Sequence, residues 1–384
     1  MARILLRNAR LLDPEAAEPR AASLLLEEGR VAALLGADAS GAGDAVVIDL
    51  DGRPLAPGLI DLHWHGALPF TAPDSFADPL REASERRLAE GVTAFLPTTV
   101  VQPAAELAET VTRLAWTLGT ERWPGAVPLG LHLEGPWISP DAAGAQPSDG
   151  IRPVDPGEAR EILERGSGLV RMVTLAPEVP GAEALIEELG RREVVAALGH
   201  SRAAASQVER AIEAGARHVT HLWNAMSPLH HREPGLVGCA LSDERLSFDL
   251  VCDGVHVDPR VVKIGFRAGP ERLILITDRV EAVEAARIGG SMLREQGGAV
   301  RLADGRLAGS ALVLDAALRN LRRFTNASLL ESVKAATLRP ARLLGLEAER
   351  GTFRPGARAD LVFFDEAGRV LETWIAGECV YAVA

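Results

Sequence analysis

Short apolar runs alternate with longer amphipathic stretches through the middle of the chain. The amphipathic stretches are rich in Ala, Glu, Arg and Leu, and several end in Gly, as helices often do. The apolar runs are nearly continuous, which is typical of parallel strands buried on both faces. The eight runs are PGLIDLHWH (57–65), VTAFLPTTV (92–100), AVPLGLHLEG (126–135), LVRMVTLAP (169–177), VVAALGHS (194–201), HVTHLWNAM (218–226), LSFDLVCDGVH (246–256) and RLILITD (272–278).

The spacing of these runs indicates the fold class. Eight strand–helix units over about 220 residues are typical of a (β/α)8 TIM barrel. Both ends of the chain instead show short alternating strands with Gly or Asp at the turns. Neither end could bury a core alone, so we expect the two to pair. The prediction is an α/β protein with a small β-sandwich domain from residues 1–56 and 350–384, and a TIM barrel over 57–349.

Composition and charge are those of a globular protein with an acidic surface. The 384 residues are 47% hydrophobic, enough for a sizeable core, and carry a formal net charge of −12. Nucleic acids and anionic membranes attract basic surfaces, so neither is an expected partner. No apolar run reaches the roughly 18 residues of a membrane helix. The first residues lack the pattern of a secretory signal.

The cysteines bear on the cellular compartment. Cys239, Cys252 and Cys379 are far apart and odd in number. They match neither a disulfide framework nor a CxxC metal site. They suit a reducing environment, so a cytoplasmic location is expected.

Potential metal ligands occur at the ends of the apolar runs. In a TIM barrel the carboxyl ends of the strands meet at the face where the active site lies. Side chains alternate across a strand, so the two imidazoles of His63-Trp64-His65 face the same side. Four histidines and two acids at five run ends match the ligands of zinc, iron or manganese. The predicted catalytic centre consists of His63, His65, Glu134, His200, His221 and Asp278.

Each of these residues also has a structural interpretation. The HxH spacing can arise by chance, and Glu134 can be a buried carboxylate with a partner. Single histidines such as His200 and His221 are more often core or capping residues than ligands. Their joint occurrence at the ends of predicted barrel strands favours the metal centre.

Several longer motifs resemble one enzyme family. In chain order they are PGLIDLHWHG, GLHLEGPWISP, LGHS, HVTHLWNAMSPLHHREPGLVG, CDGVHV, ITD, LAGSALVLDAALRNL and LRPARLLGLEAERGTFRPGARADLVFFD. Nearly from end to end, they resemble the motifs of the N-acetylglucosamine-6-phosphate deacetylases of the amidohydrolase superfamily. HLWNAMSPLHHREPGLVG is the most specific of them. The resemblance implies a metal-bearing TIM barrel and a β-sandwich formed from both termini.

The resemblance also implies roles for the metal-centre residues. Glu134, His200 and His221 resemble the ligands of the metal that every member binds. His63 and His65 resemble the pair that holds a second metal in some members, with Glu134 as the bridge. Other members lack this pair and work with one metal. One or two divalent ions per chain are therefore expected, as Zn, Fe, Co or Mn.

The implied reaction is hydrolysis of the acetamide of N-acetylglucosamine 6-phosphate to glucosamine 6-phosphate and acetate, a step of amino-sugar metabolism. A metal-bound hydroxide is the expected nucleophile, because the cation lowers the pKa of its water. Asp278 is expected to act first as general base and then as general acid toward the departing nitrogen.

Contacts to the phosphorylated amino sugar are implied by the same motifs. Arg232 resembles the family's phosphate contact, and a guanidinium suits a phosphate well. Asn224 and Ala225 could add amide donors, and His231 a further contact. His256 resembles a histidine that reaches the sugar phosphate of the neighbouring subunit, which implies a homodimer.

Three segments near the expected pocket depart from the family. GAQ at 144–146 replaces the usual GAH, and Gln146 can donate a hydrogen bond to the substrate but cannot carry a charge. TDRVEAVEAARIGG replaces a loop of small residues and puts Arg279, Glu281 and Glu284 at the rim. ALPFTAPDSF lacks the usual Gly- and Asp-rich form.

Two other functions stay open. The altered segments favour an amidohydrolase that acts on a different N-acyl or cyclic amide substrate. A catalytically silent barrel that binds an amino-sugar phosphate is the alternative from another class. That alternative predicts the loss of an essential group, whereas all six positions of the predicted centre are intact.

Overall fold

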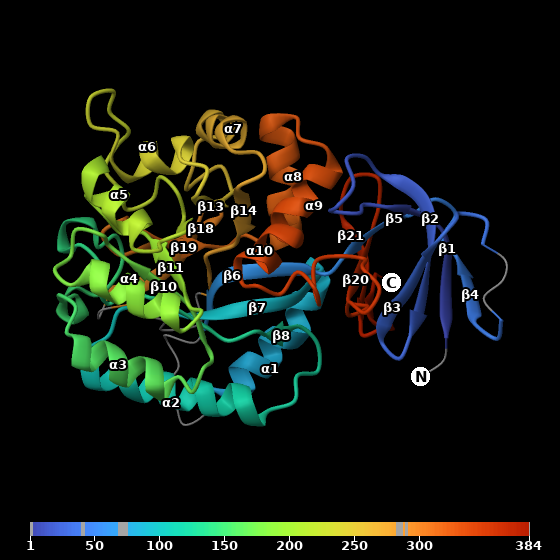
Figure 1. Ribbon diagram of the computed structural model, residues 1–384, viewed down its shortest axis with the longest axis horizontal. Coiled ribbons are helices and arrows are strands. Elements are labelled where there is room, and N and C mark those ends of the chain that lie inside the picture. The colour runs from blue at the N-terminus through green and yellow to red at the C-terminus, as the bar shows by residue number, and fades with distance from the viewer. Residues whose placement is uncertain (1–2, 40–42, 68–75, 282–286, 289–290, 384) are drawn as a thin grey trace.

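The computed structural model describes residues 3–39, 43–67, 76–281, 287–288 and 291–383. Two sheets organise this part of the chain (Figure 1). One combines strands from both ends of the chain, and the other forms a barrel surrounded by helices. Within the described residues, no helix is both long and apolar enough to cross a membrane.

The first sheet joins the two ends of the chain. Its strand order is β22-β21-β20-β5-β1-β2-β3, with β4 beside β1. Val362 of β20 lies opposite Ala56 of β5, so the C-terminal strands continue the N-terminal sheet. Leu55, Phe363 and Trp374 belong to its buried core. The strands are β1 (Ile4–Leu11), β2 (Arg20–Glu27), β3 (Arg30–Leu35), β4 (Val46–Asp49), β5 (Pro54–Pro57), β20 (Leu361–Phe364), β21 (Val370–Ile375) and β22 (Glu378–Ala382). The predicted β domain built from both termini is confirmed.

Parallel strands form the barrel in the order β6-β7-β9-β10-β11-β12-β13-β14. They are β6 (Leu59–Gly66), β7 (Val92–Thr99), β9 (Leu131–Glu134), β10 (Val170–Leu175), β11 (Val195–Leu198), β12 (His218–Val219), β13 (Ser247–Val251) and β14 (Leu273–Ile276), with the short β8 (Val127–Pro128) beside β7. Each barrel strand lies within or overlaps one of the eight apolar runs, and the TIM barrel is confirmed. The division into 1–56 plus 350–384 and 57–349 stays a prediction. The strands of the first sheet lie within 1–56 and 350–384, except that the last residue of β5 is Pro57. The strands of the barrel sheet lie within 57–349.

The first and eighth strands of the barrel meet around a buried carboxylate. Beyond β14 the chain continues into β15 (Arg279–Val280), which pairs in parallel with β6. Asp61 on β6 accepts hydrogen bonds from Thr277 N at 3.2 Å and from Thr277 Oγ1 at 2.6 Å. The buried guanidinium of Arg87 also donates to Asp61, at 2.5 Å. Hydrogen bonds between charged groups are strong in such surroundings. They hold the strand with the HxH pair against the strand that leads to the predicted catalytic aspartate.

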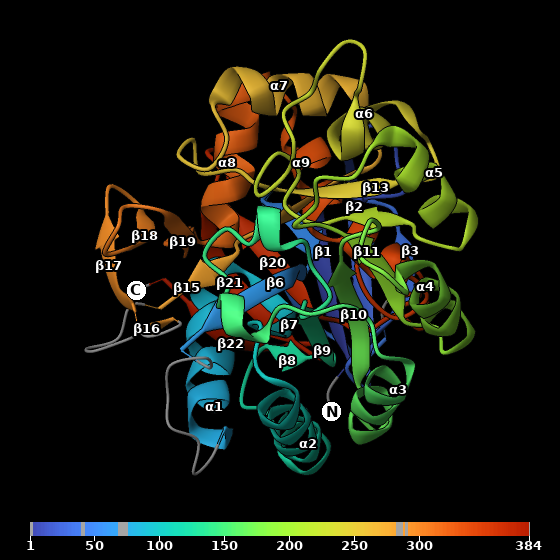
Figure 2. The same cartoon turned by 90° about the vertical axis from the view of Figure 1, so that its left-hand side faces the viewer.

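Helices cover the outside of the barrel (Figure 2). In α2 the buried Leu107, Val111 and Leu114 recur every three to four positions and form one apolar face. The helices are α1 (Ala77–Arg86), α2 (Ala104–Thr120), α3 (Pro156–Arg165), α4 (Ala182–Arg191), α5 (Ala205–Glu213), α6 (Gly235–Ser242), α7 (Pro259–Ala268), α8 (Leu314–Thr325), α9 (Leu329–Ala336) and α10 (Leu338–Leu343), with 3-10 turns η1 (Arg87–Glu90), η2 (Pro140–Ala142) and η3 (Ser148–Gly150).

The apolar pattern does not predict a group of antiparallel strands between β14 and α8. We call them the hairpin segment: β16 (Arg287–Ile288), β17 (Ser291–Gln296), β18 (Ala299–Leu302) and β19 (Leu307–Ser310). β19 pairs in parallel with β15, which attaches the segment to the barrel. It lies at the left of the barrel in Figure 2. A small core of its own is formed by Val280, Ile288, Leu293, Val300, Leu302 and Ala308.

Candidate metal centre and active site

The predicted centre comes together at the carboxyl ends of the barrel strands. Two of its residues lie on β6, one ends β9, and the other three follow β11, β12 and β14 by two residues: His63, His65, Glu134, His200, His221 and Asp278. Five of the six line a cavity of about 280 Å³. The sixth, His63, is fully buried and is not among the described residues that line it. The barrel therefore brings all six predicted residues to one site.

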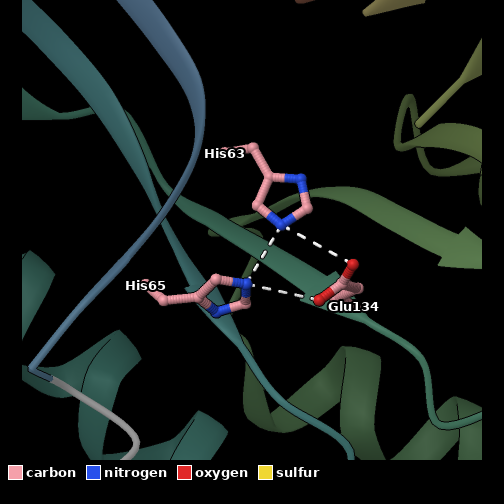
Figure 3. A group of neighbouring side chains, drawn as sticks. All are labelled: His63, His65 and Glu134. Carbon is pink, nitrogen blue, oxygen red and sulfur yellow. Dashed lines mark hydrogen bonds and ion pairs between the residues drawn. The ribbon is translucent and has the colours of Figure 1, made fainter. Parts of the chain in front are cut away.

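Glu134 lies between two pairs of histidines. Its Oε1 is 3.0 Å from His200 Nε2 and 2.9 Å from His221 Nε2. On the other side, Oε2 is 3.3 Å from His65 Nε2, and Oε1 is 3.6 Å from His63 Nε2 (Figure 3). We call Glu134 with His63 and His65 the HxH group. Glu134 with His200 and His221 is the strand-end group.

Asp278 borders the HxH group. Its Oδ1 is 3.5 Å from His63 Nε2 and 3.4 Å from His65 Nε2. Its backbone N–H donates to His63 O at 2.9 Å, which fixes the start of the side chain. The carboxylate lines the cavity and keeps 14% of its side chain exposed. Asp278 thus has access both to the cluster and to a molecule in the cavity.

Backbone carbonyls orient two of the imidazoles. His200 Nδ1 lies 2.9 Å from Ala142 O, and His65 Nδ1 lies 3.1 Å from Thr98 O. A carbonyl only accepts, so each Nδ1 carries a proton and each Nε2 points into the centre. Metal-binding histidines are commonly held in this way through their second nitrogen.

The residues that follow the strands share an uncommon backbone conformation. φ is +47° at His200, +34° at His221 and +48° at Asp278. For residues other than glycine such values cost about 1–3 kcal/mol each and persist only where surrounding contacts impose them. His200 O accepts from Ser139 N at 3.0 Å, and Asp278 O accepts from Ser310 N at 2.8 Å. Strained backbone thus coincides with the functional side chains, as at many active sites.

The electrostatics of the cluster favour positive charge. Burial by itself lowers the pKa of His65, but hydrogen bonds to Asp278 and Glu134 outweigh it and raise this pKa to about 10. Burial also lowers the pKa of His221, but the hydrogen bond to Glu134 outweighs burial and raises this pKa to about 9. Burial also opposes ionisation of Glu134, yet the charge of His63 and bonds from the histidines hold its pKa well below the usual range. A divalent cation can replace the protons on these imidazoles, because metal ligands bind in their deprotonated form.

The donor set fits a divalent metal ion. Within each of the two groups, the potential ligand atoms lie within 4.8 Å of one another. Imidazole nitrogen with carboxylate oxygen suits Zn, Fe, Co and Mn. The buried position, the oriented Nε2 atoms and the ionised carboxylate meet the remaining requirements of such a site.

Comparison with known proteins agrees with this chemistry. A family model described as the amidohydrolase family matches residues 55–380. The chain belongs to the amidohydrolase family. The amidohydrolase is 37% identical to the N-acetylgalactosamine-6-phosphate deacetylase of Escherichia coli O157:H7, over 86% of this chain and 89% of that protein. It is 35% identical to the N-acetylglucosamine-6-phosphate deacetylase of Homo sapiens, over 98% of this chain and 90% of that protein.

Solved structures show the same relationship. The N-acetyl-D-glucosamine-6-phosphate deacetylase of Mycobacterium smegmatis, as an aspartate-to-alanine mutant in complex with N-acetyl-D-glucosamine-6-phosphate, matches with a TM-score of 0.89 and 34% identity over 100% of both chains. The Thermotoga maritima enzyme matches with a TM-score of 0.86 and 31% identity, over 99% of this chain and 100% of that one. The resemblance to the N-acetylglucosamine-6-phosphate deacetylase family is confirmed.

Four of the predicted substrate residues line the cavity of the amidohydrolase: Gln146, Asn224, Ala225 and His256. His256 Nδ1 is 2.6 Å from Asp253 Oδ2, and Asp253 Oδ1 also accepts from His256 N at 2.8 Å. These bonds turn the imidazole toward the cavity of its own chain. That His256 also reaches the sugar phosphate of the neighbouring subunit stays a prediction.

The other two predicted substrate residues, His231 and Arg232, lie on the exposed loop before α6. Arg232 Nη1 donates to His231 Nε2 at 2.8 Å. Neither is among the described residues that line the cavity. Within one chain, the fold does not bring the predicted phosphate contact to the metal centre.

The expectation that the loop after β14 crowds the rim is wrong for Arg279 and Glu281. Arg279 Nη1 lies 3.3 Å from Glu90 Oε1, and Arg86 Nη2 lies 2.6 Å from Glu281 Oε2. These ion pairs direct the side chains of Arg279 and Glu281 toward η1 and α1. Neither Arg279 nor Glu281 is among the described residues of the cavity wall.

Sequence reasoning missed the cavity wall contributed by the hairpin segment and the strand before it. Val280, Ile288 and residues 306–309 line the cavity. The motif LAGSALVLDAALRNL contains part of this wall and carries the family resemblance, but nothing in it suggests a role at the site. Glu284 and residues 68–75, expected near the rim, lie outside the described residues.

Proposed function

We propose that this amidohydrolase hydrolyses the acetamide of N-acetylglucosamine 6-phosphate to glucosamine 6-phosphate and acetate. The observation that carries the proposal is the position of Asp278. Its carboxylate faces the cavity while lying 3.4 Å and 3.5 Å from two histidines of a cluster that fits a metal ion. Amide hydrolysis needs one group that accepts a proton from water and returns it to the leaving nitrogen. The relatives that act on 6-phosphorylated N-acetyl amino sugars supply the substrate class.

Different residues of the chain have different parts in the reaction. A divalent ion, when bound, polarises the amide carbonyl and lowers the pKa of the attacking water. Asp278 accepts the proton of that water as it attacks the carbonyl carbon. Asp278 then donates the proton to the sugar nitrogen, because an amine leaves readily only when it is protonated. Glu134 and the histidines would hold the ion and would transfer no protons.

We propose two ions in each chain, drawn from Zn, Fe, Co and Mn. The strand-end group would hold the first, and the HxH group the second. Glu134 would bridge them, which is supported by the contacts of its two oxygens with histidines of both groups. Elemental analysis of the purified protein gives the number and the identity directly.

We propose that Asn224, Ala225 and His256 contact the sugar within their own chain, because they line the cavity. Arg232 and His231 would contact the 6-phosphate from a second copy of the chain. Their exposed position outside the cavity of their own chain supports this arrangement. A homodimer is therefore part of the proposal. A fully active monomer in light scattering would contradict it.

A cytoplasmic location is proposed on separate grounds. Cys239, Cys252 and Cys379 are all free in the structure. Unpaired cysteines suit a reducing compartment. Fractionation of cells with an antibody against the protein tests the location.

N-acetylgalactosamine 6-phosphate is a second candidate substrate. A deacetylase for that sugar is 37% identical to this chain. Acetate release from the two epimers distinguishes these candidates.

The proposal is tested by measuring acetate release from three compounds. N-acetylglucosamine 6-phosphate is expected to give the highest kcat/KM, the galacto epimer a lower one, and unphosphorylated N-acetylglucosamine the lowest. No acetate from either phosphate ester, with each of the four metals supplied, would contradict the function. Equal kcat/KM for the phosphorylated and unphosphorylated sugars would remove the role of Arg232.

A further inference from the structure

Gln146 makes two hydrogen bonds that fix the orientation of its side-chain amide. The backbone N–H of Val101 donates to Gln146 Oε1 at 2.8 Å. A backbone N–H only donates, so the oxygen of the amide must lie on this side. The amide nitrogen then points the other way and donates to Glu134 Oε2. Both ends of the amide are therefore in use inside the protein.

The bond from Gln146 reaches the oxygen of Glu134 that faces the HxH group. Oε2 is 3.3 Å from His65 Nε2. Oε1 is 3.0 Å and 2.9 Å from the two histidines of the strand-end group, and 3.6 Å from His63 Nε2. The last torsion of a glutamate side chain is broad, so a fixed donor on one oxygen decides which histidines each oxygen meets. An ionised carboxylate oxygen can accept this bond and still offer a lone pair to a cation.

The loop that carries Gln146 is itself held from two sides. Arg306 Nη1 of the hairpin segment donates to Gly144 O at 2.5 Å. Ala145 packs against the small core of the hairpin segment. Gly144 has a φ of +60°, and a Cβ added there would lie 3.4 Å from His200 Cε1. The loop is thus pressed against the strand-end group while its last residue reaches Glu134.

We propose that Gln146 is a positioning residue that keeps Glu134 in a bridging orientation, with Oε2 directed to His65 and Oε1 to the histidines of the strand-end group. The inference rests on the proposed metal-dependent function. Without the donor, Glu134 can turn Oε2 away from His65, which leaves the HxH group only the longer contact of Oε1 with His63. Gln146 therefore controls retention of the second ion and leaves the first in place. This role replaces the direct substrate contact expected for Gln146.

Metal retention by Gln146→Ala tests the inference. Wild type and variant are loaded with Zn²⁺ and dialysed against a graded series of chelator concentrations, and zinc per chain is measured by elemental analysis. Wild type is expected to hold two ions. The variant is expected to bind the second ion about 10- to 100-fold more weakly, the usual effect of losing a residue that supports a ligand. It should keep the first ion with the affinity of wild type.

Gln207→Ala serves as the matched control. Gln207 Oε1 accepts from Ala204 N at 2.9 Å at the start of α5 and does not line the cavity. Its removal costs a side-chain amide bond of the same kind at a place that cannot affect Glu134. This variant is expected to retain both ions as wild type does.

Two further substitutions separate positioning from folding. Gln146→His keeps an N–H donor and is expected to bind the second ion more tightly than Gln146→Ala does. Gln146→Met has nearly the same size but no N–H donor, so it should lose the second ion as readily as Gln146→Ala. Melting temperatures of the metal-free proteins identify a variant that does not fold, and the other variants then carry the test.

The inference is overturned if Gln146→Ala and Gln146→Met retain both ions as tightly as wild type, or if wild type binds a single ion. A different result tests the proposed function. A wild type that binds two ions but releases no acetate from either phosphorylated amino sugar contradicts that function and leaves the role of Gln146 in metal retention standing.

Discussion

The histidines of the HxH group and those of the strand-end group contact the same carboxylate, but they occupy different kinds of position in the chain. His63 and His65 come from one strand, where alternation alone puts residues two positions apart on the same side. His200 and His221 come from two strands, and each lies beyond the end of its strand with a positive φ. The histidine pair of the HxH group is therefore local in the sequence. The strand-end group exists only once several strands are in register.

The two groups differ in backbone conformation more than in the contacts that orient them. Each has one imidazole held by a carbonyl: His200 by Ala142 O at 2.9 Å, and His65 by Thr98 O at 3.1 Å. Each also has one histidine whose backbone N–H donates to a carboxylate and whose Nδ1 has no hydrogen-bond partner in the described part of the chain, His221 with Asp249 and His63 with Asp61. Of these four histidines, only His200 and His221 have a positive φ, which persists only where surrounding contacts impose it. We therefore expect the strand-end group to hold the ion that the reaction cannot do without.

His221→Ala should have the largest effect, since it removes a ligand of the strand-end group. We expect loss of the first ion and a kcat at least about 10³-fold lower, because a catalytic metal contributes several kcal/mol and each 1.36 kcal/mol is tenfold in rate. Acetate release and elemental analysis check this. Turnover within tenfold of wild type would mean that the strand-end group is not the essential one.

Asp278→Asn should lower kcat by about 10²–10⁴-fold, the usual contribution of a general acid–base. The amide has the shape of the carboxylate but cannot take the proton of the attacking water. Both groups should keep their ions, because Asp278 belongs to neither. Loss of metal together with activity would instead make Asp278 a ligand.

Asp249→Asn tests the support of the strand-end group without touching a ligand. We expect its first ion to be bound about 10- to 100-fold more weakly, with kcat at saturating metal changed little. Chelator competition measures the affinity. An affinity equal to that of wild type would show that this carboxylate does not support the strand-end group.

His63→Asn should have the smallest effect on turnover. We expect the metal content to fall from two ions to one and kcat to change by less than about tenfold, since the essential ion remains. If wild type bound one ion and the variant were unaffected, His63 and His65 would have a packing role only.

The barrel and the metal centre could be predicted from the sequence because their signals are local. The eight apolar runs are nearly continuous, and the six polar residues of the centre stand out at their ends. The hairpin segment has no such signal. In β17 the described burial shows one buried residue, Leu293, within SMLREQ, so no apolar run marks the strand.

Other features depend on contacts between distant parts of the chain. Arg279 and Glu281 turn away from the cavity because they pair with Glu90 and Arg86, 189 and 195 positions away. Motifs suggested that Gln146 contacts the substrate, but its bonds to residues 12 and 45 positions away give it another role. Partners at these separations cannot be identified from one sequence.

The hairpin segment has a consequence for how such an enzyme can change. It closes a core of its own, joins the barrel through β15 and β19, and supplies residues of the cavity wall without supplying any of the six residues of the metal centre. Part of the cavity wall therefore lies in a part of the chain that contains none of the metal-centre residues. Mutations in β16 to β19 can change the shape of that wall while the six residues of the metal centre are inherited unchanged.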